Sequence, residues 1–119
     1  MKKKILVIED DSDILDITTT VLNINNFEVF GVDGTEDILG LVKDQQPDLV
    51  LTDYMLPGLT GGQICKLIKT NKDTKDIPVV LMSAYSKQAI AIGNFQYDAF
   101  IKKPFDINYL VAVINKFVN

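Results

Sequence analysis

The chain has 119 residues, of which 47% are hydrophobic and 24% charged, values typical of a single globular domain that we place at residues 1–119. Its net charge of −4 argues against direct binding to nucleic acid or to an anionic membrane surface. It has no histidine and one cysteine, Cys65, which excludes histidine-based catalysis, histidine metal ligands and an intramolecular disulfide. No apolar run can cross a membrane and the first residues do not form a signal peptide, so we expect a cytoplasmic protein.

The chain begins with a predicted strand and an amphipathic helix. Residues 4–8 form a short apolar run that predicts a strand buried on both faces. Asp11 or Ser12 follows at a position where a side chain can cap the next helix. Spacings of i, i+3, i+4 and i+7 in that helix predict one stripe facing the core, formed by Ile14, Ile17, Thr18 and Val21.

A second strand and a second helix come next. Residues 27–32 alternate in part between polar and apolar side chains, which is typical of an edge strand. Gly34-Thr35 opens the second helix, and Pro47 ends it because proline cannot continue a helix. The predicted inner face of this helix consists of Ile38, Leu39 and Val42.

The middle of the chain carries a strongly apolar strand. Asp48 begins this strand, which runs to Asp53, and Pro57-Gly58 then turns the chain back. Asp53 is therefore expected at the carboxyl end of a central, buried strand. Gly61-Gly62 precedes a third helix, whose predicted stripe consists of Ile64, Leu67 and Ile68.

The next part of the chain contains a clear strand and a poor helix. Residues 79–82 are all apolar and predict a fourth buried strand. The segment 86–96 has a weak helical period, because Ile90 and Ile92 are two residues apart and a glycine follows them. Cys65 is expected to be a small packing residue rather than a reactive thiol.

The last elements complete a regular alternation. Residues 98–102 predict a short fifth strand, and Asp106 caps a last helix whose core side is formed by Ile107, Leu110, Val111, Ile114 and Val118. Five strands that alternate with helices predict an α/β fold, a doubly wound parallel sheet between two helical layers. The first, third and fourth strands are the most apolar and should be central, which gives the strand order 2-1-3-4-5 with right-handed crossovers.

Polar residues stand where the strands end. They are Glu9-Asp10 after the first strand, Asp53 at the end of the third, Ser83 at the end of the fourth and Lys103 after the fifth. The carboxyl ends of parallel strands meet at one edge, where ligands bind in such sheets, so we expect these side chains to converge. Carboxylates so close together need a counter-charge, and an all-oxygen ligand set favours Mg²⁺ or Mn²⁺.

A site of this kind would stabilise a group with several negative oxygens beside Asp53, and a phosphoryl group fits. A carboxylate can act as a nucleophile and form an acyl phosphate. The metal ion, the Lys103 ammonium, the Ser83 hydroxyl and backbone N–H groups would then neutralise the phosphoryl oxygens.

Four segments carry a resemblance to a known family. They are Ile5-Leu6-Val7-Ile8-Glu9-Asp10-Asp11, the stretch from Pro47 to Gly58, Leu81-Met82-Ser83-Ala84 and Lys103-Pro104-Phe105. With these motifs in order, the chain resembles the receiver domain of two-component response regulators over nearly its whole length. The resemblance implies one receiver domain with a flavodoxin-like (βα)5 fold.

The resemblance also implies a phosphoacceptor and its metal site. Asp53 would accept the phosphoryl group. Glu9, Asp10, Asp53 and the backbone carbonyl of Met55 would bind Mg²⁺ (or Mn²⁺) beside it.

Further roles follow from the same resemblance. Ser83 would bond the phosphoryl group and Lys103 would pair with it. Phe100 falls at the aromatic switch position, and its ring would move inward as Ser83 is drawn to the phosphate, which reshapes the face formed by the fourth helix, fifth strand and fifth helix. Tyr85 and Met55 flank the site, and we expect Tyr85 to shield the acyl phosphate from water.

The expected partners are proteins. Because the chain has no histidine, the phosphoryl donor must be another protein, and the resemblance implies a histidine kinase or a histidine phosphotransfer protein. A downstream protein or a fused output domain would read the switched face, which could also form a homodimer. The chain would catalyse only its own phosphorylation and dephosphorylation, so we do not class it as an enzyme. We expect no direct nucleic-acid contact and no membrane insertion.

Three other functions stay open on the sequence alone. Mg²⁺-dependent phosphatases and phosphotransferases resemble an Asp-x-Asp pattern with the second acid as general acid, but here that position is Met55. A flavodoxin-like binding protein needs a Ser/Thr/Gly-rich phosphate loop where this chain has Glu9-Asp10-Asp11. A degenerate receiver, used only for protein contacts, would not need the complete set of site residues.

The site residues also have structural interpretations. Asp53 could cap a turn, and a serine such as Ser83 is common after a strand. Lys102 competes with Lys103, which is preferred because it directly precedes Pro104, as in the family.

The chain departs from the family between Ser83 and Lys103. This segment is shorter than the resemblance leads us to expect, and the usual Gly-Ala-Asp approach to the fifth strand reads Gln96-Tyr97-Asp98. We therefore expect an altered fourth helix on the surface that would carry the output.

Overall fold

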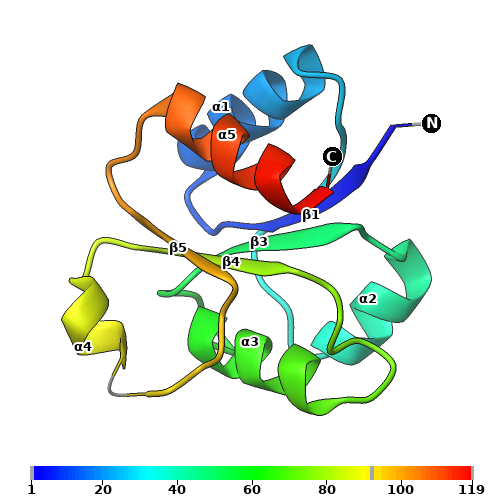
Figure 1. The fold of residues 1–119 in the computed structure, drawn as a ribbon, viewed down its shortest axis with the longest axis vertical. Helices are drawn as coiled ribbons and strands as arrows, with labels where there is room; N and C mark the ends of the chain where they lie inside the picture. The colour runs from blue at the N-terminus through cyan, green and yellow to red at the C-terminus, as the bar shows by residue number, and fades with distance from the viewer. Residues whose placement is uncertain (1, 92, 119) are drawn as a thin grey trace.

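The computed structural model describes residues 2–91 and 93–118, which form one parallel sheet with helices on both faces (Figure 1). The strands are β1 (Lys4–Ile8), β2 (Glu28–Val32), β3 (Leu49–Asp53), β4 (Val79–Ser83) and β5 (Ala99–Lys102). The helices are α1 (Ser12–Ile24), α2 (Ile38–Gln45), α3 (Gly61–Thr70), α4 (Lys87–Ala91) and α5 (Ile107–Val118). The strand order β2-β1-β3-β4-β5, parallel throughout, confirms the predicted fold class and topology.

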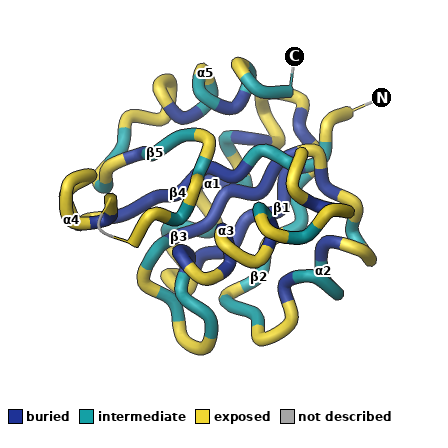
Figure 2. Tube along the Cα trace, turned by 60° about the horizontal axis from the view of Figure 1, so that its bottom comes forward, coloured by how far each residue is buried: buried dark blue, intermediate teal, exposed yellow. Residues whose placement is uncertain are grey.

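The sheet separates two hydrophobic clusters. Helices α1 and α5 cover one face, and α2, α3 and α4 lie on the other (Figure 1). Successive strand residues point to opposite faces, so Leu51 packs toward α1 and α5 while Val50 packs toward α2 and α3. All residues of β3 and β4 are buried, whereas β2 and β5 are partly exposed (Figure 2), as predicted for central and edge strands. Burial of each aliphatic side chain contributes about 2 kcal/mol to the stability of the fold. The central strands therefore hold the residues at their ends in fixed positions.

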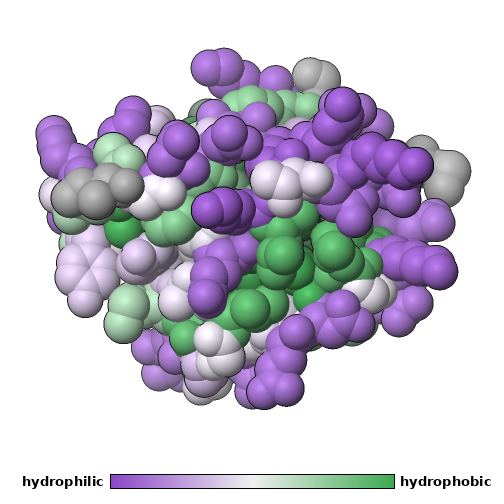
Figure 3. Space-filling model, turned by 90° about the horizontal axis from the view of Figure 1, so that it is seen from below, coloured by the Kyte–Doolittle hydropathy of each residue, from purple (hydrophilic) through white to green (hydrophobic). Residues whose placement is uncertain are grey.

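The face over α2, α3 and α4 is hydrophilic at its margins, and apolar side chains gather where α2 and α3 meet (Figure 3). A groove of about 630 Å³ lies between α2 and the loop after α3, with Leu39, Val42 and Ile77 among its lining residues. It lies away from the carboxyl ends of the strands, since Ile77 and its neighbours lead into β4.

Helix α1 begins with a side-chain cap. One carboxylate oxygen of Asp11 accepts hydrogen bonds from the backbone N–H groups of Asp13 (3.0 Å) and Ile14 (3.1 Å). Ser12 is therefore the first helical residue rather than the cap. The bond orients the start of α1 beside the end of β1.

The predicted core stripe of α1 is wrong at Ile17, which is 54% exposed. The buried positions are Thr18 and Leu22, and Leu15 packs against the same core cluster. Spacings of three and four residues join these three side chains just as they join the predicted set. Periodicity alone therefore could not choose between two neighbouring stripes of the same helix.

Helix α2 begins at Ile38, not at Gly34-Thr35 as predicted. The backbone at Thr35 is engaged instead in a parallel bridge to Gly58, and its hydroxyl accepts the N–H of Asp37 at 3.0 Å. Asp37 then caps the helix with its own side chain. The sequence signal at Gly34-Thr35 thus marks a loop contact and not the helix start.

Helix α3 includes the two glycines that were predicted to precede it. Thr60 is the N-cap and forms a reciprocal capping box with Gln63. Cys65 is buried, as expected for a packing residue, whereas Leu67 is partly exposed. The predicted stripe is therefore confirmed at Ile64 and Ile68, which are buried, and wrong at Leu67.

The link between β4 and β5 contains only a short helix. Helix α4 has five residues, with Ile90 buried, while Ile92 lies outside the described residues. Asp98 was predicted to open β5, but it precedes the strand, and its carboxylate accepts the N–H of Val79 at 2.7 Å. The fourth helix, which the sequence leads us to expect in altered form, is thus short in this chain.

Helix α5 closes the fold. Asp106 accepts the backbone N–H of Asn108 at 2.7 Å, in keeping with its predicted capping role. Leu110 and Ile114 are buried, but Ile107, predicted on the core side, is 40% exposed because it stands in the first turn at the rim. Among the described residues, no helix has the length and apolar character needed to span a bilayer.

Candidate functional site

Three carboxylates meet at the carboxyl end of the sheet. Glu9 and Asp10 follow β1, and Asp53 is the last residue of the neighbouring strand β3. One oxygen from each lies within 4.8 Å of the other two. Glu9 and Asp53 are buried and Asp10 is exposed, so the cluster opens to solvent on one side. The three acids that the sequence places at this edge do come together.

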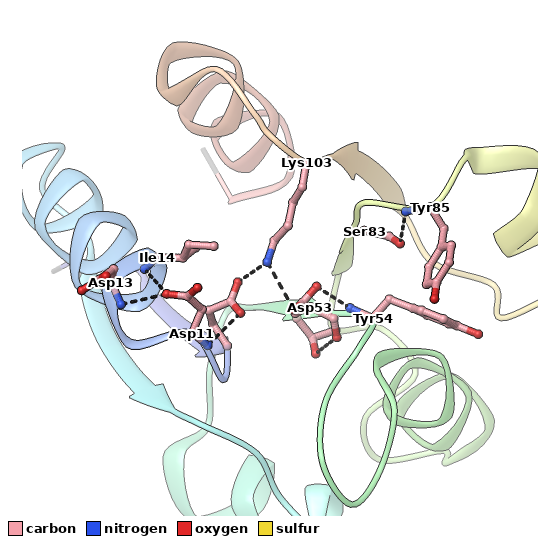
Figure 4. A network of polar contacts seen from close by, with 10 residues as sticks. Asp11, Asp13, Ile14, Asp53, Tyr54, Ser83, Tyr85 and Lys103 are labelled. Carbon is pink, nitrogen blue, oxygen red and sulfur yellow. Dashed lines mark hydrogen bonds and ion pairs between the residues drawn. The ribbon is translucent and has the colours of Figure 1, made fainter.

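Lys103 lies between two of these carboxylates. Its ammonium is 2.5 Å from Oε1 of Glu9 and 3.2 Å from Oδ2 of Asp53, and it reaches them from the loop after β5 (Figure 4). Burial opposes the charged form of Lys103, but the hydrogen bond to Glu9 and the charge of Asp53 outweigh it and raise the pKa of the lysine. Lys102 instead donates to a backbone carbonyl in the loop after β4, at 3.1 Å. The geometry therefore separates the two lysines that the sequence left in competition.

Glu9 depends on that lysine. Its side chain is 1% exposed, and burial raises its pKa, with the nearby charge of Asp53 acting in the same direction. Hydrogen bonds from Lys103 and from the backbone N–H of Asp11 (3.2 Å to Oε2) oppose this shift. The ionised form of Glu9 is thus held by partners that come from the two ends of the chain.

The turn after β3 holds Asp53 in place. The backbone N–H of Tyr54 donates to Oδ1 of Asp53 at 2.9 Å, and the carbonyl of Tyr54 accepts the N–H of Gly61 at 2.9 Å. A Cβ at Gly61 would collide with the carbonyl oxygen of Asp53. Glycine is therefore required for the start of α3 to approach the end of β3 this closely.

The other predicted site residues surround the carboxylates. Ser83 ends β4, and its hydroxyl oxygen accepts the N–H of Tyr85 at 2.9 Å, which leaves the hydroxyl hydrogen able to donate. Tyr85 and Met55 lie in the loops after β4 and β3, each about half exposed. Phe100 is half-buried in β5, with its ring centroid 5.8 Å from that of Tyr97.

Sequence reasoning missed Tyr54. Its ring meets the ring of Tyr85 edge to face, with centroids 6.1 Å apart and planes at 86° (Figure 4). The available signal was an aromatic residue directly after Asp53, which ends the strand next to the one that leads to Tyr85. Two loops that flank the site are thereby joined by side chains as well as by the sheet.

The donor set fits a hard divalent cation. All three side chains offer carboxylate oxygens, and separations of up to 4.8 Å suit ligands around one ion with bonds of about 2.0–2.6 Å. Three carboxylates against the single ammonium of Lys103 leave an excess of negative charge among these described residues. Glu9, Asp10 and Asp53 could therefore hold Mg²⁺ or Mn²⁺.

Comparison with known proteins identifies the family. Residues 5–115 match the family model of the response regulator receiver domain. The chain belongs to this family. It is therefore a receiver domain of the two-component response regulators, signalling proteins whose receiver is in general switched by phosphorylation, and its sheet has the flavodoxin-like order of that family.

Individual relatives agree with this assignment. The chain is 35% identical over 116 residues to the phosphate regulon transcriptional regulatory protein PhoB of Klebsiella pneumoniae, covering 96% of this chain and 51% of the relative. It is 33% identical over 115 residues to the DNA-binding response regulator MtrA of Mycobacterium leprae, covering 94% and 49%. The chain thus spans about half the length of these relatives. The solved structure of the response regulator TrrA of Thermotoga maritima, in complex with Mg²⁺ and BeF, gives a TM-score of 0.85 at 26% identity and covers 97% of this chain and 98% of that chain.

Proposed function

We propose that this chain is a phosphorylation-dependent switch in which Asp53 accepts a phosphoryl group from the phosphohistidine of a histidine kinase or a histidine phosphotransfer protein. The observation that carries this proposal is the Lys103 ammonium, joined to both Glu9 and Asp53 at the open end of the sheet. An aspartate that only capped a turn would need neither a largely buried lysine nor two further acids within 4.8 Å.

The transfer itself is a nucleophilic displacement. A carboxylate oxygen of Asp53 attacks the donor's phosphorus, the phosphorus–nitrogen bond breaks, and its electron pair stays on the donor imidazole. When bound by Glu9, Asp10, Asp53 and the backbone carbonyl of Met55, a Mg²⁺ or Mn²⁺ ion would supply positive charge for the phosphoryl oxygens. The complex of TrrA with Mg²⁺ and BeF supports this choice of ion.

The chain's own residues then respond to the new group. Lys103 keeps its contact with Glu9 and turns its remaining donors to a phosphoryl oxygen, because an ammonium has three. Ser83 donates its hydroxyl hydrogen to another phosphoryl oxygen. Movement of Ser83 opens room for the ring of Phe100 to turn inward, and Tyr85 covers the acyl phosphate against water.

The switched surface is the face formed by α4, β5 and α5. A groove of about 480 Å³ lies on it, with Lys87, Phe100 and Tyr109 among its lining residues. We propose that this face controls a downstream protein partner or a fused output domain, or pairs with a second copy of the chain. The name of MtrA describes DNA binding for that protein. For this chain we propose protein partners and a cytoplasmic setting, and the expectation of no nucleic-acid contact, which rests on the net charge of −4 alone, is not kept.

The test is incubation with acetyl phosphate and Mg²⁺ followed by intact mass measurement. The wild type should gain one phosphoryl group, Asp53→Asn should gain none, and Asp44→Asn, which alters an exposed acid on α2, should behave as wild type. An adduct that persists in Asp53→Asn, or no adduct in the wild type, rejects the assignment.

The same samples separate the alternative functions. Continued release of inorganic phosphate from an external aryl phosphate would indicate a phosphatase, whereas a switch stops after modifying itself. A wild type that neither binds Mg²⁺ nor forms an adduct would be a degenerate receiver that acts only through protein contacts.

A further inference from the structure

The ring of Phe95 fills a slot between two glycines. Phe95 lies in the link between α4 and β5, and its ring points at Gly62 in the first turn of α3. A Cβ at position 62 would lie 2.6 Å from the terminal ring carbon Cζ of Phe95, and one at Gly93 would collide with the same ring. The ring therefore fits only because both flanking positions lack a side chain.

The backbone on both sides of Phe95 is held in an unusual conformation. Asn94 has φ = 51° and Gln96 has φ = 63°, a region that residues other than glycine seldom adopt. The carbonyl of Phe95 accepts the buried thiol of Cys65 at 2.9 Å. Such a conformation persists where its surroundings enforce it, and here the seated ring and the thiol do so.

The seated ring also belongs to a row of three aromatic side chains that ends at the site. The centroid of Phe95 is 5.9 Å from that of Tyr54, and Tyr54 in turn meets Tyr85 edge to face at 6.1 Å. Tyr54 directly follows Asp53, and Tyr85 donates its N–H to Ser83 (Figure 4). The position of Tyr85 is thus set by contacts that run back to Phe95.

We propose that Phe95 is a positioning residue that sets how long the phosphoryl group stays on Asp53, acting through Tyr54 on Tyr85. The inference rests on the proposed phosphorylation of Asp53. In the step concerned, a water oxygen attacks phosphorus, the bond from phosphorus to the Asp53 carboxylate oxygen breaks, and inorganic phosphate and a proton leave. Tyr85 is half exposed, so without Tyr54 and Phe95 behind it the ring can swing away and admit that water.

The alternative is that Phe95 only fills space. A residue that only fills space changes the stability of the fold when replaced, but it leaves the chemistry of the folded molecules as it was. The rate at which the folded, phosphorylated chain loses its phosphoryl group is therefore the measurement that separates the two roles.

The experiment compares loss of the phosphoryl group after acetyl phosphate is removed, at a temperature where circular dichroism shows every variant folded. Phe95→Leu keeps apolar volume and removes the ring. Gly62→Ala leaves Phe95 itself intact and pushes the ring out of its slot, without weakening α3, because alanine favours a helix more than glycine does. Lys66→Ala, an exposed change on α3, is the control. Tyr85→Ala and the double variant Tyr85→Ala with Phe95→Leu complete a double-mutant cycle.

We expect Phe95→Leu and Gly62→Ala each to speed phosphoryl loss about two- to tenfold, the range that aromatic contacts of this kind support, and Lys66→Ala to match the wild type. In the Tyr85→Ala background, Phe95→Leu should add nothing. The inference is overturned if the two slot variants decay at the wild-type rate, or if Phe95→Leu acts equally with and without Tyr85. Either result leaves the adduct on Asp53, and with it the proposed function, in place. Failure of the wild type to form any adduct rejects the proposed function itself.

Discussion

Replacing Lys103 by methionine tests whether its ammonium balances the buried acids of the resting protein. Methionine keeps most of the aliphatic length and removes the charge. The ammonium contacts Glu9 and Asp53, and the exposed fraction of the side chain is 14% for Lys103, 1% for Glu9 and 9% for Asp53. The variant therefore leaves two buried carboxylates side by side without the counter-charge that Lys103 supplies. We expect the fold to persist with a lower free energy of unfolding.

The size of the loss follows from what Glu9 can do instead. It can become neutral by taking up a proton. The unfolded pKa of a glutamate is near 4.3, so pH 7 lies roughly 2.7 units above it. At about 1.36 kcal/mol for each unit, protonation at pH 7 costs about 3.7 kcal/mol. Breaking one side of a buried ion pair costs about 3–5 kcal/mol in other proteins. We therefore expect the free energy of unfolding to fall by about 3 kcal/mol at pH 7.

The loss should depend on pH in one direction. Burial already raises the pKa of Glu9, and removal of Lys103 raises it further. The folded variant then binds a proton more readily than its unfolded chain, so its deficit grows as pH rises above the unfolded pKa and shrinks as pH falls toward it. At pH 5 the same reasoning leaves a deficit of about 1 kcal/mol.

Urea unfolding followed by circular dichroism, with a chelator present, measures the loss of unfolding free energy at pH 7 and at pH 5. Lys102→Met is the matched control, because Lys102 is exposed and, within the part of the chain that the structure describes, its ammonium bonds a backbone carbonyl and no carboxylate. It should change the free energy of unfolding by less than about 0.5 kcal/mol. Equal losses in the two variants at pH 7 would refute the assignment of the counter-charge to Lys103.

Three further predictions concern the helices. Leu22→Ala should cost about 3 kcal/mol of unfolding free energy and Ile17→Ala less than about 0.5 kcal/mol, and equal losses in urea unfolding would contradict the observed face of α1. Within the described residues the buried hydroxyl of Thr18 has no hydrogen-bond partner. Thr18→Val should therefore raise the free energy of unfolding by about 1 kcal/mol, which is measured as a higher melting temperature. A melting temperature below that of the exposed variant Thr20→Val would count against this. Burial raises the pKa of Cys65 to about 12, so iodoacetamide at pH 8 should label it slowly in the folded chain and rapidly in urea; equal labelling would show the thiol to be accessible.

The sheet was predictable because its signals are local. Apolar runs such as residues 4–8 and 79–82 appear in the structure as buried strands, and their relative apolarity was enough to place the edges. The starts of the helices were harder to predict from the sequence. The start of α2 depends on Thr35, which bridges to Gly58 far along the chain, and the sequence near Thr35 carries no sign of that contact.

The candidate site shows the same division. Glu9, Asp53 and Lys103 could be placed together because parallel strands deliver their carboxyl ends to one edge. Tyr54 and Phe95 could not, because their contact depends on the path of a short irregular link and on two glycines that leave room for a ring. The positions of the strand ends follow from the topology, whereas contacts between loops depend on the path that each loop takes.

The negative charge of the carboxylates at the site affects both the stability of the fold and the proposed function. In the resting chain the acids around Asp53 outnumber the one ammonium of Lys103 among the described residues, and phosphorylation of Asp53 would replace a carboxylate of charge −1 by an acyl phosphate of charge about −2, a gain of about one negative charge. On the proposed function, a cation bound by these carboxylates would favour the phosphorylated chain, and by linkage the phosphoryl group would raise the affinity for the cation by the same factor. Lys103, which reaches Glu9 across 94 positions of sequence, would then act in both states. On the same proposal the rigid strand ends fix where this charge changes, and the face formed by α4, β5 and α5 is where the change alters the shape of the surface.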